Sequence, residues 1–201
     1  MLVLGTRRLY ESGTVMLREG ERTSHVLVLV KGFVKVTATS PEGYLSLLAI
    51  RTGGDLVGEL ASMDGEPRIA TVTAAGRVWA RVVSQHEFHR YLTHHPDVAL
   101  AVSSSVGAKL RWATRRRIDF GGHEVHVRLA RVLVELAGTY GVEDGEIGVP
   151  LTQPELAALV GAAEPTVHRA LANLRKEGIV ATGYRRIVVC DRHRLATLAD
   201  G

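Results

Sequence analysis

The sequence contains a single cysteine, Cys190, among its 201 residues. An intramolecular disulfide is therefore excluded, and so is a zinc or iron–sulfur site held by several cysteines of one chain. Long apolar runs are also missing: no stretch reaches the ~18 residues of a membrane-spanning helix, and the opening MLVLGTRRLY lacks the apolar core of a signal peptide. These absences predict a cytoplasmic protein with no membrane partner.

Groupings typical of catalysis and metal binding are scarce as well. His25 is the only histidine between residues 1 and 81, so a metal-dependent enzyme built on that region would lack its ligand set. Four histidines follow later in the chain: His86, His89, His94 and His95. They have no carboxylates at ligand spacing beside them, so they are interpreted as part of a polar helix face. No Ser-His-Asp or Cys-His order stands out, so we expect neither an enzyme nor a metal site.

The charge balance leans towards a polyanionic partner. The chain carries 25 Lys and Arg against 21 Asp and Glu, which gives a net charge of +4 and a sequence pI near 9.5. This excess suits nucleic acid but does not prove it, because many basic proteins bind nothing acidic. At this length, two modest domains are expected.

The first part of the chain, to about Arg81, reads as β-structure. Short segments rich in β-branched residues alternate with glycines at a spacing of roughly ten residues, which is typical of a small antiparallel sandwich or roll. HVLVLVKGFVKVTAT, residues 25–39, predicts two strands around Lys31 and Gly32. An antiparallel β-roll is therefore expected here.

The periodicity changes after Ser84. One set of small and apolar residues has spacings of 3, 4, 4 and 3: Ala99, Val102, Val106, Leu110 and Ala113. Such a narrow stripe favours one long helix that pairs with a copy of itself, although a surface helix packed on its own domain is an alternative. Gly121 and Gly122 are expected to end this helix and to form a hinge. The run Arg115–Arg117 is interpreted as solvated.

A helix-turn-helix is predicted near the C-terminus. Thr152 can cap a helix that has Pro154 in its first turn and Glu155 at its third position. A turn over residues 161–163 leads to a second helix with an apolar face: Val167, Ala170, Leu171 and Leu174. GIVATGYRRIVV then predicts a hairpin with a basic tip. The whole indicates a winged helix.

In this order of parts the sequence resembles the cyclic AMP receptor protein and fumarate–nitrate regulator (Crp/Fnr) superfamily of bacterial transcription regulators. The resemblance covers nearly the whole chain and implies an α+β fold: a cyclic-nucleotide-binding-like β-roll over residues 1–95, a dimerisation helix and hinge over 96–121, and a winged helix-turn-helix over 122–201. The expected partners are double-stranded DNA and a second copy of the chain, with RNA polymerase as a further option.

The stretch GELASMDGEPRIATV, residues 58–72, resembles the phosphate-binding cassette of this family. The residues that match its pattern are Gly58, Glu59, Leu60, Ala61, Arg68 and Ala70. The glycine would let the backbone approach a ligand, Arg68 would bind two phosphate oxygens, and Glu59 would accept a hydrogen bond from a ribose hydroxyl. A local Glu59–Arg68 salt bridge is the alternative. The implied effector is cyclic AMP or cyclic GMP, with no required cofactor.

Two positions in this implied site depart from the family or complete it. Ile69 stands where nucleotide-binding members usually have Ser or Thr, and the lost hydroxyl would weaken binding by ~1.5–3 kcal/mol. Thr114 matches a position on the dimer helix that holds the base, while Ala113 replaces the other polar residue often found there. An effector site that has lost nucleotide binding is therefore an alternative.

The resemblance also names DNA-contacting residues. Thr166 and Arg169 match positions that contact phosphate and base, and an arginine there suits guanine. Glu164 and Pro165 replace an Arg-Glu pair of the best-known members. We therefore do not expect this chain to bind the DNA sequence that those members recognise. His168 lies at the margin of the same face. Phosphate contacts are expected from Thr152 and Gln153 in the first helix, and from Arg185 and Arg186 in the wing.

The sequence thus predicts a homodimeric DNA-binding transcription regulator that responds to a small ligand. One alternative is a regulator of the same fold that binds DNA without a nucleotide. A more distant one is a nucleotide-binding regulatory subunit of a partner enzyme.

Overall fold

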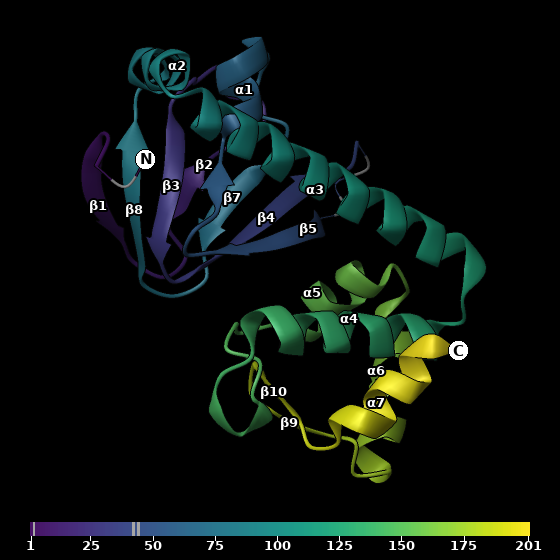
Figure 1. Cartoon of the computed structure of the whole chain (residues 1–201). Helices are drawn as coiled ribbons and strands as arrows, with labels where there is room; N and C mark the ends of the chain where they lie inside the picture. The colour runs from purple at the N-terminus through teal and green to yellow at the C-terminus, as the bar shows by residue number, and fades with distance from the viewer. Residues whose placement is uncertain (2, 42, 44) are drawn as a thin grey trace. The chain divides into compact units, whose positions relative to one another are not determined.

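The computed structural model describes residues 1, 3–41, 43 and 45–201 of the chain (Figure 1). The chain divides into two compact units, Met1–Leu110 and Arg111–Gly201. The division falls inside the longest helix, α3 (Pro96–Gly122), which contributes residues to both units. Each unit has its own core.

Two antiparallel sheets of four strands form the first unit, as expected for a β-roll. Their strand orders are β1-β8-β3-β6 and β2-β7-β4-β5. The strands are β1 (Thr6–Tyr10), β2 (Val15–Leu17), β3 (Val26–Lys31), β4 (Phe33–Thr39), β5 (Leu45–Thr52), β6 (Leu56–Val57), β7 (Thr71–Ala74) and β8 (Val78–Val83). The predicted break between two strands at Gly32 is confirmed, because β3 ends before it and β4 begins after it.

Strand β3 explains how the first unit is layered. Leu27 and Leu29 belong to the core between the two sheets, whereas Val26 and Val28 belong to a second cluster with Phe88 of helix α2 (Gln85–His94). Alternate side chains of a strand point to opposite faces, so both faces of β3 are buried. This accounts for the uninterrupted apolar run VLVL of residues 26–29.

Helix α3 corrects part of the predicted dimer stripe. Val102 is 5% exposed and packs in the Val26–Phe88 cluster of its own unit. The large apolar residues of α3 that do face solvent are Leu100, Leu110, Ile118 and Phe120. The prediction was wrong for Val102 because spacing alone does not tell which of two adjacent stripes meets the sheet.

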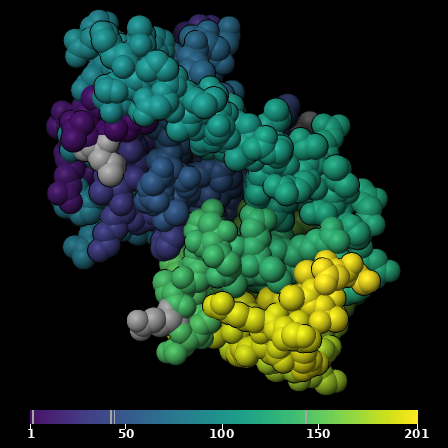
Figure 2. Space-filling model, viewed as in Figure 1, coloured from purple at the N-terminus to yellow at the C-terminus, as the bar shows by residue number. Residues whose placement is uncertain are grey.

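The second unit is helical with a small hairpin. Its elements after α3 are α4 (Val125–Tyr140), the short 3₁₀ turn η1 (Glu143–Gly145), α5 (Gln153–Val160), α6 (Glu164–Lys176), β9 (Val180–Gly183), β10 (Arg186–Val189) and α7 (Arg192–Asp200). Helix α7 packs on α4 through the buried Leu195 and forms part of the outer surface (yellow in Figure 2). No sequence pattern had indicated α7.

The predicted helix-turn-helix is confirmed in detail. The Thr152 side chain accepts a hydrogen bond from the Glu155 backbone N–H, and the Glu155 carboxylate accepts one from the Thr152 N–H, which completes the capping box. Helix α5 ends at Gly161, whose φ of 66° lies in the left-handed region. Helix α6 begins at Glu164 and buries Val167, Leu171 and Leu174.

The end of α3 is fixed to the second unit. Arg116 is only 9% exposed, and it pairs with Glu135 of α4 at 3.2 Å. The indole N–H of Trp112 donates to the same carboxylate, and Arg131 joins Asp119 to the carbonyl of Ala199 in α7. The prediction that Arg116 is solvated was therefore wrong, because its guanidinium is buried and pairs with the half-buried Glu135.

The predictions for the paired glycines and for Cys190 have different outcomes. Helix α3 runs to Gly122, which confirms that paired glycines end it. The apolar terminal segment around Cys190 predicts a packed side chain. That prediction was wrong, because Cys190 lies just after β10 and is exposed. Within the described residues, none of the helices has the length and hydropathy needed to cross a lipid bilayer.

Candidate effector site and DNA-binding surface

The cassette residues are brought together at the start of helix α1 (Glu59–Asp64). Gly58 caps this helix with a φ of 84°, a left-handed conformation that glycine adopts without strain. A Cβ atom at Gly58 would lie 2.7 Å from Nη1 of Arg68. The glycine is therefore required by its own backbone and by the close approach of the arginine.

Arg68 is buried and hydrogen-bonded to three groups of the first unit. Its side chain is 4% exposed, and its Nη1 and Nη2 atoms donate to the carbonyls of Gly58 at 2.7 Å and His25 at 2.5 Å. Its Nε atom donates to the Thr23 hydroxyl at 3.1 Å. Burial lowers the pKa of Arg68, whereas Glu21 and Glu59 act in the opposite direction. An arginine nevertheless stays charged at neutral pH.

Glu59 does not pair with Arg68. Its Oε1 atom lies 2.8 Å from Nζ of Lys109 in α3, and the same ammonium group donates to the carbonyl of Leu56 at 2.6 Å. The alternative of a local Glu59–Arg68 salt bridge is therefore wrong, because Glu59 pairs with a residue that lies far away in the sequence of the same unit. Sequence reasoning missed Lys109, because nothing in the residues around it points to an acid so far along the chain.

The other predicted cassette residues take different positions. Ala61 and Ala70 are buried at 6% and 8% exposed, and Leu60 is half-buried. Ile69 is 66% exposed, directly beside the buried Arg68. Thr114 is an exposed residue of α3 and belongs to the second unit.

His25 is a further polar group next to the cassette. Burial and the nearby Arg68 guanidinium lower the pKa of His25, while Glu21 raises it. A neutral imidazole is therefore favoured beside the cation. The described part of the chain has no group of three or more His, Cys, Asp and Glu side chains that could hold a metal ion.

The predicted DNA-contacting residues of α6 share one exposed face. Glu164, Thr166, His168 and Arg169 are all exposed, opposite the buried Val167 and Leu171. The ion pairs found among the described residues do not involve Arg169. This face is therefore open to a partner, as the amphipathic pattern predicts.

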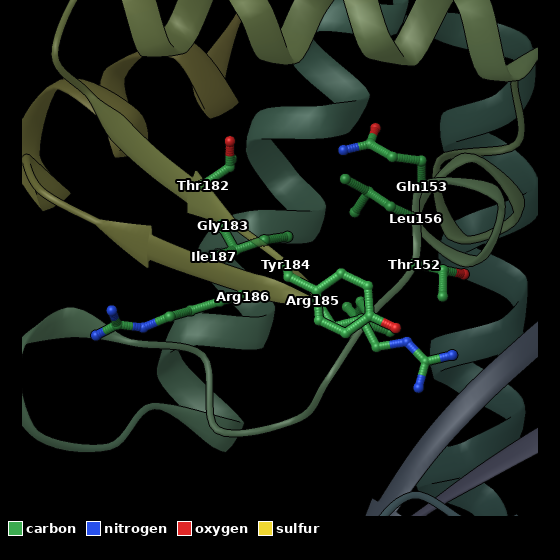
Figure 3. A pocket seen from close by; sticks show the side chains of 10 residues that line it. Thr152, Gln153, Leu156, Thr182, Gly183, Tyr184, Arg185, Arg186 and Ile187 are labelled. Carbon is green, nitrogen blue, oxygen red and sulfur yellow. The ribbon is translucent and has the colours of Figure 1, made fainter.

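A cleft of about 320 Å³ separates the start of α5 from the β9–β10 wing (Figure 3). Thr152 and Gln153 line it on the helix side, and Thr182–Ile187 line it on the wing side. The Oε1 atom of Gln153 is buried and has no hydrogen-bond partner among the described residues. The structure thus brings together the predicted phosphate-contacting residues of α5 and those of the wing.

The two wing arginines differ. Nε and Nη2 of Arg186 lie 2.7 and 2.6 Å from Oε2 of Glu146, and this hydrogen bond raises the Arg186 pKa. Arg185 instead lies over the ring of Tyr184, with 5.6 Å between the guanidinium carbon and the ring centroid. Sequence reasoning treated the two as equivalent, because it had no signal for Glu146.

Comparisons with known proteins agree with this architecture. A model of the cyclic nucleotide-binding domain matches residues 7–95, and a model of the Crp-like helix-turn-helix domain matches residues 127–198. A "CRP-like cAMP-activated global transcriptional regulator" of Mycobacterium tuberculosis is 28% identical over 193 residues, which cover 94% of this chain and 86% of the relative. The cAMP-activated regulator CRP of Salmonella typhimurium is 26% identical and covers 90% of this chain and 87% of its own length.

Solved structures give the same fold. FixK2 from Bradyrhizobium japonicum superposes with a TM-score of 0.84 at 24% identity and covers 97% of both chains. A Crp/Fnr-family transcriptional regulator from Thermus thermophilus has a TM-score of 0.82 at 26% identity, with 98% and 99% covered. A nucleotide-binding-type roll, a Crp-like helix-turn-helix and relatives that regulate transcription rather than catalyse reactions lead to one conclusion: the chain belongs to the Crp/Fnr superfamily of ligand-responsive, DNA-binding transcription regulators.

Proposed function

We propose that the chain is a homodimeric transcription regulator whose DNA binding is controlled by a cyclic nucleotide bound at the cassette. The observation that carries the effector is the buried Arg68 beside the capping Gly58. The planar guanidinium group of an arginine can donate to two phosphate oxygens at once. The M. tuberculosis and S. typhimurium relatives are both described as cAMP-activated.

The hydrogen-bonding capacity of Arg68 supports a phosphate ligand. A guanidinium group has five N–H donors, and the contacts with Thr23, Gly58 and His25 use one on each nitrogen. One N–H on each of Nη1 and Nη2 is left for a ligand. These two donors would bind two oxygens of a phosphate, and Glu59, the first residue of α1, would accept a hydrogen bond from a ribose hydroxyl.

The exposed side of α3 supports a homodimer. Leu100, Leu110 and Ile118 are 69%, 67% and 64% exposed, and their positions fall on one side of the helix together with Gly107 and Thr114. Large aliphatic side chains on one side of a long helix favour pairing with a second copy. Two α6 helices about 34 Å apart would then match successive major grooves.

DNA reading is assigned to α6 and is tested by Arg169→Ala. If Arg169 contacts guanine through two hydrogen bonds, the variant loses ~1–3 kcal/mol at the selected site and relaxes preference at one base pair of each half-site. Folding should not change, because Arg169 is exposed. Equal losses on selected and random DNA would show that another residue enters the groove. RNA polymerase stays a predicted partner.

One rival function has an observation in its favour. Arg68 already donates to three groups of the chain, Glu59 is paired with Lys109, and Ile69 supplies no hydroxyl. These features suit a regulator that binds DNA without a nucleotide.

Calorimetric titration with cyclic AMP and cyclic GMP, followed by selection of genomic DNA fragments with and without each nucleotide, separates this rival from the proposed function. Nucleotide binding that raises DNA affinity supports the proposal, whereas equal DNA affinity without nucleotide binding supports the rival.

A further inference from the structure

We propose that the end of α3 forms a binding site for a ligand with linked phosphate groups when two copies of the chain pair. Each site takes Arg111 from one copy and Arg117 from the other, so a single copy holds only half of a site. The inference rests on the proposed homodimer. It concerns a ligand other than the cyclic nucleotide that is proposed for the cassette.

The end of α3 has more positive charge than its own contacts neutralise. Between Asp97 and Asp119 the helix has no acidic residue, but it has five basic ones: Lys109, Arg111, Arg115, Arg116 and Arg117. Lys109 and Arg116 pair with acids at 2.8 and 3.2 Å, and Asp119 pairs with Arg131 at 2.7 Å. The other three arginines are exposed, and the ion pairs found in the described part of the chain do not include them.

Two of these three arginines flank the side of α3 that the proposed dimer buries. That side includes Leu110, Thr114 and Ile118, with Thr114 at its centre. Successive residues of an α-helix are turned by about 100° from each other. Three residues in either direction from Thr114 therefore place Arg111 about 60° to one side of it and Arg117 about 60° to the other. Both arginines lie at the edges of the proposed interface.

A twofold dimer would bring these edges together. Each α3 ends at its own winged helix, and both winged helices must reach the same DNA, so the two α3 helices pair in parallel. In a parallel pair, one edge of the first helix faces the opposite edge of the second. Arg111 of one copy then faces Arg117 of the other, about 9 Å farther along the axis, since six residues rise by about 1.5 Å each.

The chemistry of these facing edges indicates an anion. Like charges that face each other across an interface oppose association. A phosphate group between Arg111 and Arg117 would turn this repulsion into attraction, because each guanidinium can donate two parallel hydrogen bonds to phosphate oxygens. Two linked phosphates suit the axial separation of the two side chains better than one, since each arginine can then bind its own phosphate.

The test measures the dissociation constant of the dimer by sedimentation of the full chain over a dilution series without cyclic nucleotide. The buffers contain sodium chloride or sodium pyrophosphate at equal ionic strength. Pyrophosphate should tighten the wild-type dimer about tenfold, because a ligand that binds only the dimer stabilises it by mass action. Arg111→Gln and Arg117→Gln should each pair more tightly than wild type in chloride, since one of the facing charges is removed, and should respond little to pyrophosphate.

Arg115→Gln is the matched control. Arg115 is exposed but lies about 100° from Thr114, so this variant should keep the wild-type response to pyrophosphate. A wild-type dimer that is indifferent to pyrophosphate overturns the inference alone. So does a normal response in the double variant Arg111→Gln/Arg117→Gln, because the anion then acts elsewhere, for example at Arg68. A wild type that stays monomeric with pyrophosphate and also with cyclic AMP overturns the proposed homodimer as well.

Discussion

The Nζ atom of Lys109 lies 2.8 Å from Oε1 of Glu59, and this contact joins α3 to the first residue of α1. The side chains are 22% and 6% exposed, so the acid is the more deeply buried partner. Any movement of α3 along the roll must either carry Glu59 with it or break this pair.

The pair should matter for stability. Lys109→Met removes the cation that is paired directly with the buried Glu59 carboxylate, so the free energy of unfolding should fall by ~1–3 kcal/mol. Urea denaturation measures this. Lys31→Met, at an exposed position of β3, is the control and should change stability by less than ~0.5 kcal/mol. A Lys109 variant as stable as the control would mean that the ion pair contributes nothing.

Ile69 allows a test by gain of function. Ile69→Ser supplies a hydroxyl beside Arg68, and a hydrogen bond to a charged phosphate contributes ~1.5–3 kcal/mol, so cyclic AMP should bind about 10- to 100-fold more tightly. Because Ile69 is 66% exposed, the thermal stability of the ligand-free protein should hardly change. Calorimetry of Ile69→Ser beside Ile69→Ala separates the hydroxyl from the mere removal of bulk; equal affinities would contradict the prediction.

Leu110 tests the dimer surface. Leu110→Glu places a carboxylate on the exposed side of α3, where pairing with a second copy would bury it, so sedimentation should show folded monomers. Leu48→Glu introduces the same charge at an exposed site of β5 and should leave the dimer intact. If both variants sediment as dimers, the dimer surface lies elsewhere.

His25 predicts a pH dependence of stability. Burial and Arg68 hold its folded pKa below the unfolded value of about 6.5. Between these values the unfolded chain binds more protons than the folded one, so the free energy of unfolding should fall as the pH drops below about 6.5. His25→Gln should flatten this part of the profile in urea denaturation from about pH 7 to pH 5.5, whereas His193→Gln, at an exposed position of α7, should not.

Local signals in the sequence were sufficient for most of the fold. The capping box at Thr152 and the left-handed Gly161 are specified by residues a few positions apart, and both appear as expected. The break at Gly32 is equally local. Such features depend on backbone conformation, which nearby residues determine.

The site was less predictable where distant residues meet. Glu59 pairs with Lys109, and Arg186 pairs with Glu146. The partners are far apart in the sequence, and no rule of residue spacing predicts such pairs. Arg68 matched the cassette pattern, yet its carbonyl acceptors at Gly58 and His25 were not foreseen. Arg68→Leu would orphan both carbonyls, so this variant tests folding together with ligand binding. The charge partners of a group follow from tertiary packing, which local patterns do not encode.

The attachment of the end of α3 also determines how the molecule should open. Trp112, Arg116 and Asp119 are tied to α4 and α7, whereas Val102 is buried among residues of the roll. One continuous helix therefore belongs to two cooperative units of unfolding. In native-state hydrogen exchange, amides near Val102 should gain and lose protection with the roll, and those from Trp112 to Phe120 with the winged helix. The amides around Leu110 would then exchange at a rate set by whichever of the two units opens first.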